Sequence, residues 1–363
     1  MGSGSVSMKN NYPLTIRKRQ DTNKLDFEEW WPDSPQKRKY ERTPVTVCIA
    51  AICKNTISPE GGFVVIGATD RMLTGGDIEY EPKSTNKIFH FSTAITGMFA
   101  GDLNLQTEVV KRVSFAVQTR INSEPQKWWE VKEVAELYAK SYQESHLKRA
   151  ENAILAPLGY DLNSFHADQQ RMNPELLKQL STKLAQFTSP EVQAIFCGLD
   201  LTGPGPHIYV VGNSANVVCH DITGFAAIGA GYWHADSQFM FAGHTYEKSF
   251  AETLLLVYSA KKRAEVAPGV GEDTDMFIIG PTLGTHTSSV GEHVLRKLQA
   301  TYKNTQSRKQ KADVKSQAEI GQFISELNKK SQAEVAKPQK IDSPVPNTSS
   351  PATKPEEPHE KRP

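Results

Sequence analysis

Residues 45–52 read Val-Thr-Val-Cys-Ile-Ala-Ala-Ile, and residues 63–71 read Phe-Val-Val-Ile-Gly-Ala-Thr-Asp-Arg. A Gly61-Gly62 pair between the two runs favours a hairpin. Both runs are apolar at consecutive positions, which is typical of strands whose two faces are both covered. The sequence therefore predicts a sheet packed between other layers, with Thr46 at the start of its first strand.

Length and composition favour a folded protein and exclude some classes of function. The chain has 363 residues, of which 38% are hydrophobic, enough to fill a sizeable core. Its 42 Lys and Arg balance 41 Asp and Glu, so nucleic-acid binding is not expected. No run of about eighteen or more apolar residues occurs, and the N-terminus lacks the apolar core of a secretory signal. No membrane association and a cytoplasmic location are the resulting expectations.

The cysteines and histidines show no pattern typical of a metal or cofactor site. Four cysteines in a chain of this length do not form a disulfide framework, and they are expected to be reduced, buried core residues. Cys48 and Cys53 are five positions apart and would point to opposite faces of a strand. The ten histidines show no metal-like pairing, and no Walker-type phosphate loop occurs. Neither a metal nor a cofactor is expected.

Composition divides the chain into four segments. Residues 1–43 are polar and charged and are interpreted as an N-terminal extension or propeptide. Residues 44–285 carry the patterns of one folded domain. Residues 286–335 are expected to form one or two helices of a C-terminal extension, with a single apolar stripe. Residues 336–363 are rich in Pro, Ser, Thr, Lys and Glu, which predicts a disordered tail.

Within residues 44–285, runs of strands alternate with pairs of helices, which favours a layered α+β domain with two sheets and helices outside them. Asp102 is expected to cap a helix, since apolar residues follow it at helical spacing. Residues 160–190 are interpreted as an inserted loop plus helix. The predicted strands are residues 45–53, 63–69, 87–91, 94–100, 192–199, 207–211, 217–220, 225–228 and 276–280.

In this order, several motifs resemble those of the proteasome-type N-terminal nucleophile (Ntn) hydrolases over residues 45–282. They are the opening strand at Thr46, Ala68-Thr69-Asp70-Arg71, Asn86-Lys87-Ile88, Gly101, Cys197-Gly198-Leu199-Asp200 and Ile228-Gly229-Ala230-Gly231-Tyr232. Each motif alone is weak, whereas the ordered set is fairly specific. The resemblance implies a four-layer αββα sandwich of two antiparallel sheets flanked by helices.

The resemblance also implies a set of catalytic residues. Thr46 would be the nucleophile once removal of residues 1–45 exposes its α-amino group, whose ordinary pKa of about 7.7 to 8.0 suits a general base. Lys87 would lower the pKa of that amine, and Asp70 would hold the lysine charged and oriented. Backbone amides of Gly229, Ala230 and Gly231 would donate to an oxyanion. Glu265 stands where the family carries a supporting aspartate.

The sequence departs from the family pattern at several of these positions. Val45 replaces the glycine that usually precedes the nucleophile. Ala230 leaves the glycine loop without a hydroxyl, and Pro268 replaces a supporting serine. Asp70 and Arg71 are adjacent, whereas the family usually leaves one residue between its aspartate and arginine, so Thr69 is an alternative for the aspartate position. These departures indicate a divergent or inactive branch.

Three functions are compatible with these features. The first is a threonine-type peptidase that uses Thr46 to cleave an amide bond of a peptide or protein substrate. The second is a catalytically inactive scaffold or assembly subunit of the same fold. The third is an amidohydrolase that acts on a small molecule. The family's habit of ring assembly implies a homo-oligomer, as a ring or stacked assembly, and the sequence does not identify an ATPase partner.

Overall fold

The computed structural model describes residues 46–57, 61–75, 78–81, 87–200, 205–280 and 287–335. The predicted extension at 1–43, Val45 and the predicted tail at 336–363 lie outside these ranges. The chain divides into two compact units, of which the first ends at Val290 and the second begins at Gly291. Each unit is described by itself.

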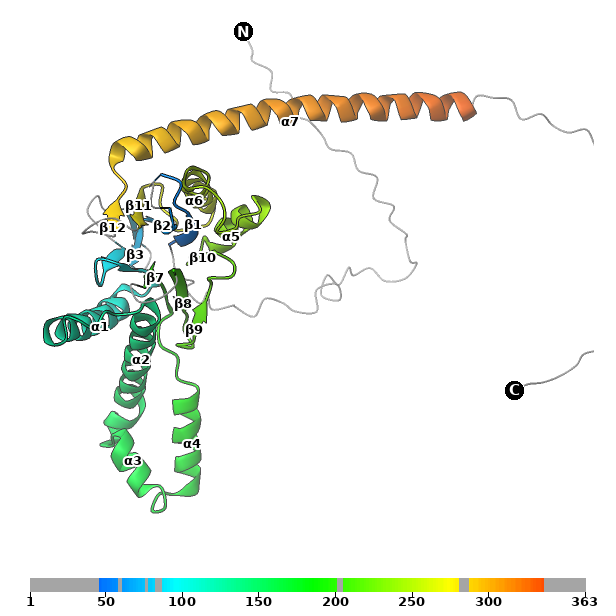
Figure 1. The fold of residues 1–363 in the computed structure, drawn as a ribbon. Coiled ribbons are helices and arrows are strands. Elements are labelled where there is room, and N and C mark those ends of the chain that lie inside the picture. The colour runs from blue at the N-terminus through cyan, green and yellow to red at the C-terminus, as the bar shows by residue number, and fades with distance from the viewer. Residues whose placement is uncertain are drawn as a thin grey trace, which may run out of the picture. The chain divides into compact units, whose positions relative to one another are not determined.

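The first unit contains two five-stranded antiparallel sheets, so the fold is mixed α+β (Figure 1). The first sheet has the strand order β10-β1-β2-β11-β12, and the second has the order β5-β6-β7-β8-β9. The strands of the first sheet are β1 Cys48–Lys54, β2 Phe63–Asp70, β10 Phe225–Ile228, β11 Thr274–Ile279 and β12 Thr287–Ser289. The strands of the second are β5 Ile88–His90, β6 Ile95–Gly101, β7 Val192–Leu199, β8 Pro206–Val211 and β9 Val217–Cys219. A further short pair joins β3 Leu73–Gly75 to β4 Ile78–Tyr80.

The two sheets share one hydrophobic core. Cys48, Ala50 and Ile52 of β1 belong to the same buried cluster as Met98 of β6 and Ile195 of β7. The intervening residues of β1 are also buried, since every residue from Val47 to Cys53 is at most 3% exposed. The prediction that both faces of the opening strand are covered is therefore confirmed.

Helices pack on each sheet. Helices α1 Leu103–Ser123 and α2 Val131–Ala150 share a buried cluster with residues of β7 such as Phe196. Helices α5 Tyr232–Phe241 and α6 Phe250–Ala264 contact strands of the first sheet. The predicted cap is confirmed, because the Asp102 side chain accepts a hydrogen bond from the Leu105 amide at 2.8 Å. The predicted apolar face of α1 is buried as well, at Leu105, Val109, Val110, Val113 and Val117.

The inserted segment after α2 forms two helices instead of the single helix expected. A turn of π-helix at Glu151–Leu155 and a 3-10 turn at Ala156–Leu158 continue α2. Helices α3 Leu162–Asp168 and α4 Pro174–Ala185 follow, and they pack around a small core of their own. In Figure 1 this pair extends away from the two sheets.

Three further features differ from or refine the sequence predictions. Strand β12 was not predicted, and it carries the first unit past residue 285 to Val290. Within the described part of the second unit, residues 291–335, one continuous helix is present, α7 Glu292–Val335. Cys219 is exposed on the edge strand β9, so its predicted burial is wrong, whereas Cys48, Cys53 and Cys197 are buried.

Among the residues that the structure describes, no helix is long and apolar enough to cross a membrane.

His207 of β8 lies between two aspartates, Asp200 after β7 and Asp221 after β9. Its Nδ1 lies 2.6 Å from Asp221 Oδ2, and its Nε2 lies 3.4 Å from Asp200 Oδ2. The other oxygen of Asp200 accepts a hydrogen bond from the Val131 amide at 2.8 Å. The hydrogen bond to Asp221 raises the pKa of His207 above its ordinary value.

This raised pKa predicts a pH-dependent contribution to stability. The stabilisation by His207 is fully present below the unfolded-state pKa of about 6.5 and is lost as the pH rises through the folded-state pKa. We expect His207→Gln to cost up to about 1 kcal/mol more at pH 6 than at pH 8.5. Urea unfolding of both proteins across this range checks the sign, and a cost that is independent of pH would contradict it.

Candidate functional site

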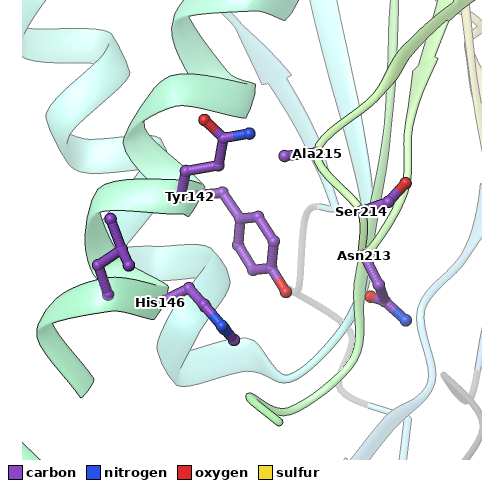
Figure 2. A pocket seen from close by; sticks show the side chains of 7 residues that line it. Tyr142, His146, Asn213, Ser214 and Ala215 are labelled. Atoms are coloured by element: carbon purple, nitrogen blue, oxygen red, sulfur yellow. The ribbon is translucent and has the colours of Figure 1, made fainter. Parts of the chain in front are cut away.

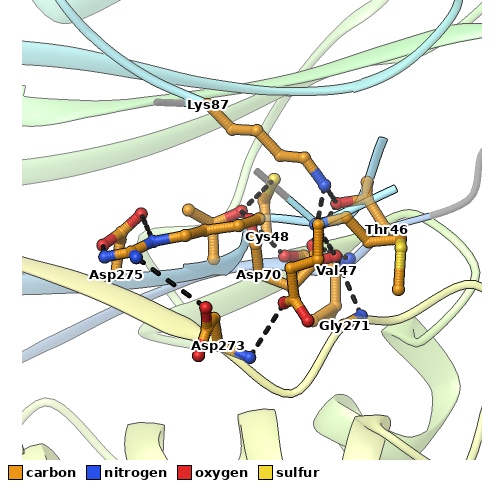
Figure 3. Close-up of polar contacts among 12 residues, drawn as sticks. Thr46, Val47, Cys48, Asp70, Lys87, Gly271, Asp273 and Asp275 are labelled. Carbon is orange, nitrogen blue, oxygen red and sulfur yellow. Dashed lines mark hydrogen bonds and ion pairs between the residues drawn. The ribbon is translucent and has the colours of Figure 1, made fainter. Parts of the chain in front are cut away.

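Thr46, Asp70 and Lys87 come together at one end of the first sheet (Figure 3). The Thr46 hydroxyl donates a hydrogen bond to Asp70 Oδ1. The Lys87 ammonium donates to Thr46 Oγ1 and also to Asp70 Oδ1, the latter at 3.0 Å. The Thr46 residue is 1% exposed, and the side chains of Asp70 and Lys87 are 0% and 8% exposed. A hydroxyl, a carboxylate and an ammonium thus form one buried cluster.

Strand pairing explains why these residues meet. In the β1–β2 ladder Cys48 is opposite Thr69, which brings the residues before β1 next to the end of β2. Thr274 of β11 pairs with Asp70 on the other side. Lys87 directly precedes β5, an edge strand of the second sheet, and its side chain reaches the first. The cluster therefore depends on the packing of one sheet against the other.

The carboxylate of Asp70 is held by backbone amides as well as by the two side chains. Oδ1 accepts from the Val47 amide at 3.0 Å. Oδ2 accepts from the Met72 amide at 3.0 Å and from the Gly271 amide at 3.1 Å. Hydrogen bonds to an ionised group are stronger than neutral ones, and a buried carboxylate needs them. Both oxygens are consequently fixed in direction.

Asp70, and not Thr69, contacts Thr46 and Lys87. Thr69 Oγ1 donates to the Val47 carbonyl at 3.1 Å and lies 3.4 Å from Cys48 Sγ. It supports the backbone beside the cluster, whereas Asp70 contacts Thr46 and Lys87 directly. Burial raises the pKa of the Cys48 thiol to about 12, so this thiol is not an ionised nucleophile at neutral pH.

Arg71 does not compete for Asp70, although the two residues are adjacent. Its Nε donates to Asp275 Oδ2 at 2.9 Å, and one terminal nitrogen donates to Asp275 Oδ1 at 2.5 Å. This two-point pair joins the residue after β2 to the neighbouring strand β11. The adjacent residues Asp70 and Arg71 thus bind different partners, and Arg71 leaves the Asp70 carboxylate to Thr46 and Lys87.

The glycine loop at 229–231 packs against the backbone of Thr46. Gly229 has φ +86°, and a Cβ at this position would overlap the Thr46 carbonyl oxygen. The Gly231 amide donates to that same carbonyl at 3.3 Å, and the Gly229 amide donates to Gln193 Oε1 at 2.9 Å. Two of the amides expected to face an oxyanion already have acceptors within the chain. Ala230, which lies between them, brings no hydroxyl to the loop.

Glu265 lies in a neighbouring cluster and not at the Thr46 hydroxyl. Its Oε1 accepts from Lys261 at 2.6 Å and from Lys262 at 2.7 Å. Gln193 and Lys261 are the residues near the site that sequence reasoning missed. No sequence signal pointed to Gln193, whereas the i,i+4 spacing of Lys261 and Glu265 on a predicted helix was available.

Two cavities elsewhere in the first unit do not include the cluster. One of about 350 Å³ lies between α2 and the β8–β9 turn and is lined by Tyr142, His146, Asn213, Ser214 and Ala215, among others (Figure 2). Another of about 570 Å³ is lined by His90, Trp128 and Trp129 with their neighbours. Among the described residues, no group of His, Cys, Asp and Glu side chains is arranged to hold a metal.

No protein-family model matches the sequence, and no curated protein matches it. The chemistry of the site therefore rests on its residues.

Substitution of Asp70 measures how much its hydrogen bonds contribute to the free energy of unfolding. We expect Asp70→Ala to lower the free energy of unfolding by about 3–5 kcal/mol, because the Lys87 ammonium and three amides lose their acceptor. Asp275→Ala is the control, since it breaks a partly exposed pair with Arg71 and should cost about 1 kcal/mol or less. Equal costs in chemical unfolding would contradict the role of Asp70.

The contact between Gly229 and Thr46 makes a second prediction. Gly159 has nearly the same φ, +81°, but a methyl group at that position would enter open space, so Gly159→Ala should cost only about 1–2 kcal/mol of backbone strain. Gly229→Ala should cost about 1–3 kcal/mol more, because the methyl group meets the Thr46 carbonyl. Thermal unfolding of the two variants measures the difference, and equal losses would show that the contact is unimportant.

Proposed function

We propose that this protein is a threonine-type amide hydrolase of the proteasome-like Ntn kind, with Thr46 as nucleophile after removal of residues 1–45. The observation that carries the proposal is the Lys87 ammonium, which donates to both Thr46 Oγ1 and Asp70 Oδ1 in a buried cluster. The two antiparallel sheets with helices packed on each support assignment to the four-layer αββα architecture.

The cut before Thr46 would supply the missing base. In the intact chain the nitrogen of Thr46 is part of a peptide bond and cannot accept a proton. Once free, the α-amino group takes the hydroxyl proton while Oγ1 attacks the carbonyl carbon of the substrate amide. The C–N bond then breaks, the leaving amine takes the proton, and the acyl group stays on Oγ1 as an ester. Water, activated by the same amine, hydrolyses that ester and restores the threonine.

Lys87 and Asp70 would set the protonation of this centre. The positive charge of Lys87 disfavours a second positive charge nearby and thus favours the neutral, basic form of the amine. It also stabilises negative charge that develops on Oγ1. Asp70 compensates the buried ammonium and fixes its position, so no reorganisation is needed during the reaction.

A second candidate function is a non-catalytic subunit of the same fold. Two observations favour it: Thr46 is 1% exposed, and neither Ala230 nor Pro268 offers a hydroxyl to support the nucleophile. Under either function we propose a cytoplasmic protein that assembles into a homo-oligomer. For the hydrolase, we propose a peptide or protein substrate.

An engineered cut separates processing from catalysis. We expect a chain carrying a protease recognition sequence directly before Thr46 to gain amidase activity on fluorogenic peptide amides when that protease exposes Thr46. Thr46→Ala in the same background should lower the activity by on the order of 10³-fold or more, whereas Thr46→Ser should retain part of it. Intact mass before and after a peptide electrophile reports whether Thr46 itself is captured.

The uncut chain is the control, and it should show neither hydrolysis nor capture. Complete exposure of the Thr46 amine without hydrolysis or capture would overturn the hydrolase and support the non-catalytic subunit. Activity that survives Thr46→Ala would assign the chemistry to another residue.

A further inference from the structure

The side chain of Lys261, on α6, is fully buried, and its ammonium is saturated with acceptors. Nζ donates to Glu265 Oε1 at 2.6 Å, to the Gly271 carbonyl at 2.7 Å and to the Glu272 carbonyl at 2.8 Å. An ammonium has three N–H donors, so each has a partner. Burial lowers the pKa of Lys261, and the hydrogen bond to Glu265 opposes that shift. The loop carbonyls are therefore bound by an internal cation.

The same loop reaches the candidate active site. The carbonyl of Gly271 accepts from Lys261, and the amide of Gly271 donates to Asp70 Oδ2 at 3.1 Å. The loop lies so close to its surroundings that a Cβ on Gly271 would overlap Glu81 Oε1 and lie 3.1 Å from Met72 Cβ. One residue thus connects the buried ammonium to the buried carboxylate.

We propose that Lys261 is a positioning residue for the threonine centre, because it fixes the backbone at 271–272 so that the Gly271 amide holds Asp70 Oδ2. Oδ1 of Asp70 then remains directed at Thr46 and Lys87. This inference rests on the proposed hydrolase function. Without the Lys261 ammonium, the Gly271 carbonyl loses its donor, whereas the Glu272 carbonyl keeps Lys262. The peptide group of Gly271 is then no longer fixed from its carbonyl side. The carboxylate then loses one of its two amide donors on Oδ2.

Lys262 provides a matched control. It is adjacent in sequence and donates to Glu265 Oε1 at 2.7 Å and to the Glu272 carbonyl at 2.9 Å. The Gly271 carbonyl, by contrast, is bound by Lys261. Lys262 thus shares two of the three acceptors of Lys261 but does not bind Gly271, the residue that donates to Asp70. Comparing the two lysines therefore separates positioning of Asp70 from a general effect of charge.

The test compares Lys261→Met with Lys262→Met in the full chain processed at Thr46. We expect Lys261→Met to lower kcat by about 10- to 100-fold. The concentration of active sites used for kcat is the amount of protein that a peptide electrophile captures. KM should change by no more than about twofold, and Lys262→Met should stay within about twofold of the parent in both constants. A folded Lys261→Met with parental kcat, or an equal loss in Lys262→Met, would overturn the proposal.

A double variant separates positioning from stability. Lys261→Met with Glu265→Leu replaces the buried ion pair by apolar side chains, a change that proteins often tolerate. We expect an unfolding temperature closer to that of the parent than the unfolding temperature of Lys261→Met, and the same loss of kcat as in Lys261→Met. A double variant that recovers the parental kcat would show that Lys261 acts only through stability and would overturn the positioning role.

Amide hydrogen exchange gives a readout that needs no activity. Gly271 should exchange about tenfold or more faster in Lys261→Met, since its amide is protected by the bond to buried Asp70, and Lys262→Met should leave it protected. If the parent hydrolyses nothing, the proposed function fails. Even then, faster exchange at Gly271 in Lys261→Met would support the conclusion that Lys261 keeps the Gly271 amide bound to Asp70. Unchanged exchange in a folded Lys261→Met would overturn that conclusion.

Discussion

The carboxylate of Asp70 accepts hydrogen bonds from three backbone amides, a hydroxyl and an ammonium while it is fully buried. A buried charge of this kind is tolerated only when every lone pair has a donor, so the groups around it are constrained together. Those groups lie just before β1, just after β2, in the loop before β11 and just before β5. The local arrangement of four segments thus depends on one side chain.

The surrounding fold shields the Asp70 carboxylate from solvent and positions its hydrogen-bond donors. The shared core of the two sheets brings Lys87, which belongs to the second, against the first. Helix α6 contacts the first sheet and carries Lys261, whose ammonium binds the loop that donates to Asp70. Gly229 permits the close approach of another loop to the Thr46 carbonyl. Packing of apolar residues and pairing of buried charges therefore support the same site.

Much of the fold follows from local patterns in the sequence. The apolar run at 47–53 and the helical spacing after Asp102 predicted a doubly covered strand and a capped helix, and both are confirmed. Strand β12 escaped prediction because three residues of Thr and Ser carry no apolar alternation. Cys219 was wrongly predicted to be buried, because the preference of cysteine for the core does not account for an edge strand. Short or edge elements depend on their neighbours more than on their own residues.

The sequence by itself determined which residues were available for the site: a threonine at the start of the first predicted strand, an aspartate after the second and a lysine at the start of the third. Their chemistry and order are local properties, so a linear pattern can show them. Only the tertiary structure decided that Asp70 and not Thr69 faces Thr46, that Glu265 binds Lys261 instead, and that Gln193 receives a loop amide. These outcomes depend on strand register and sheet packing, which join residues far apart in the chain and leave no local signal.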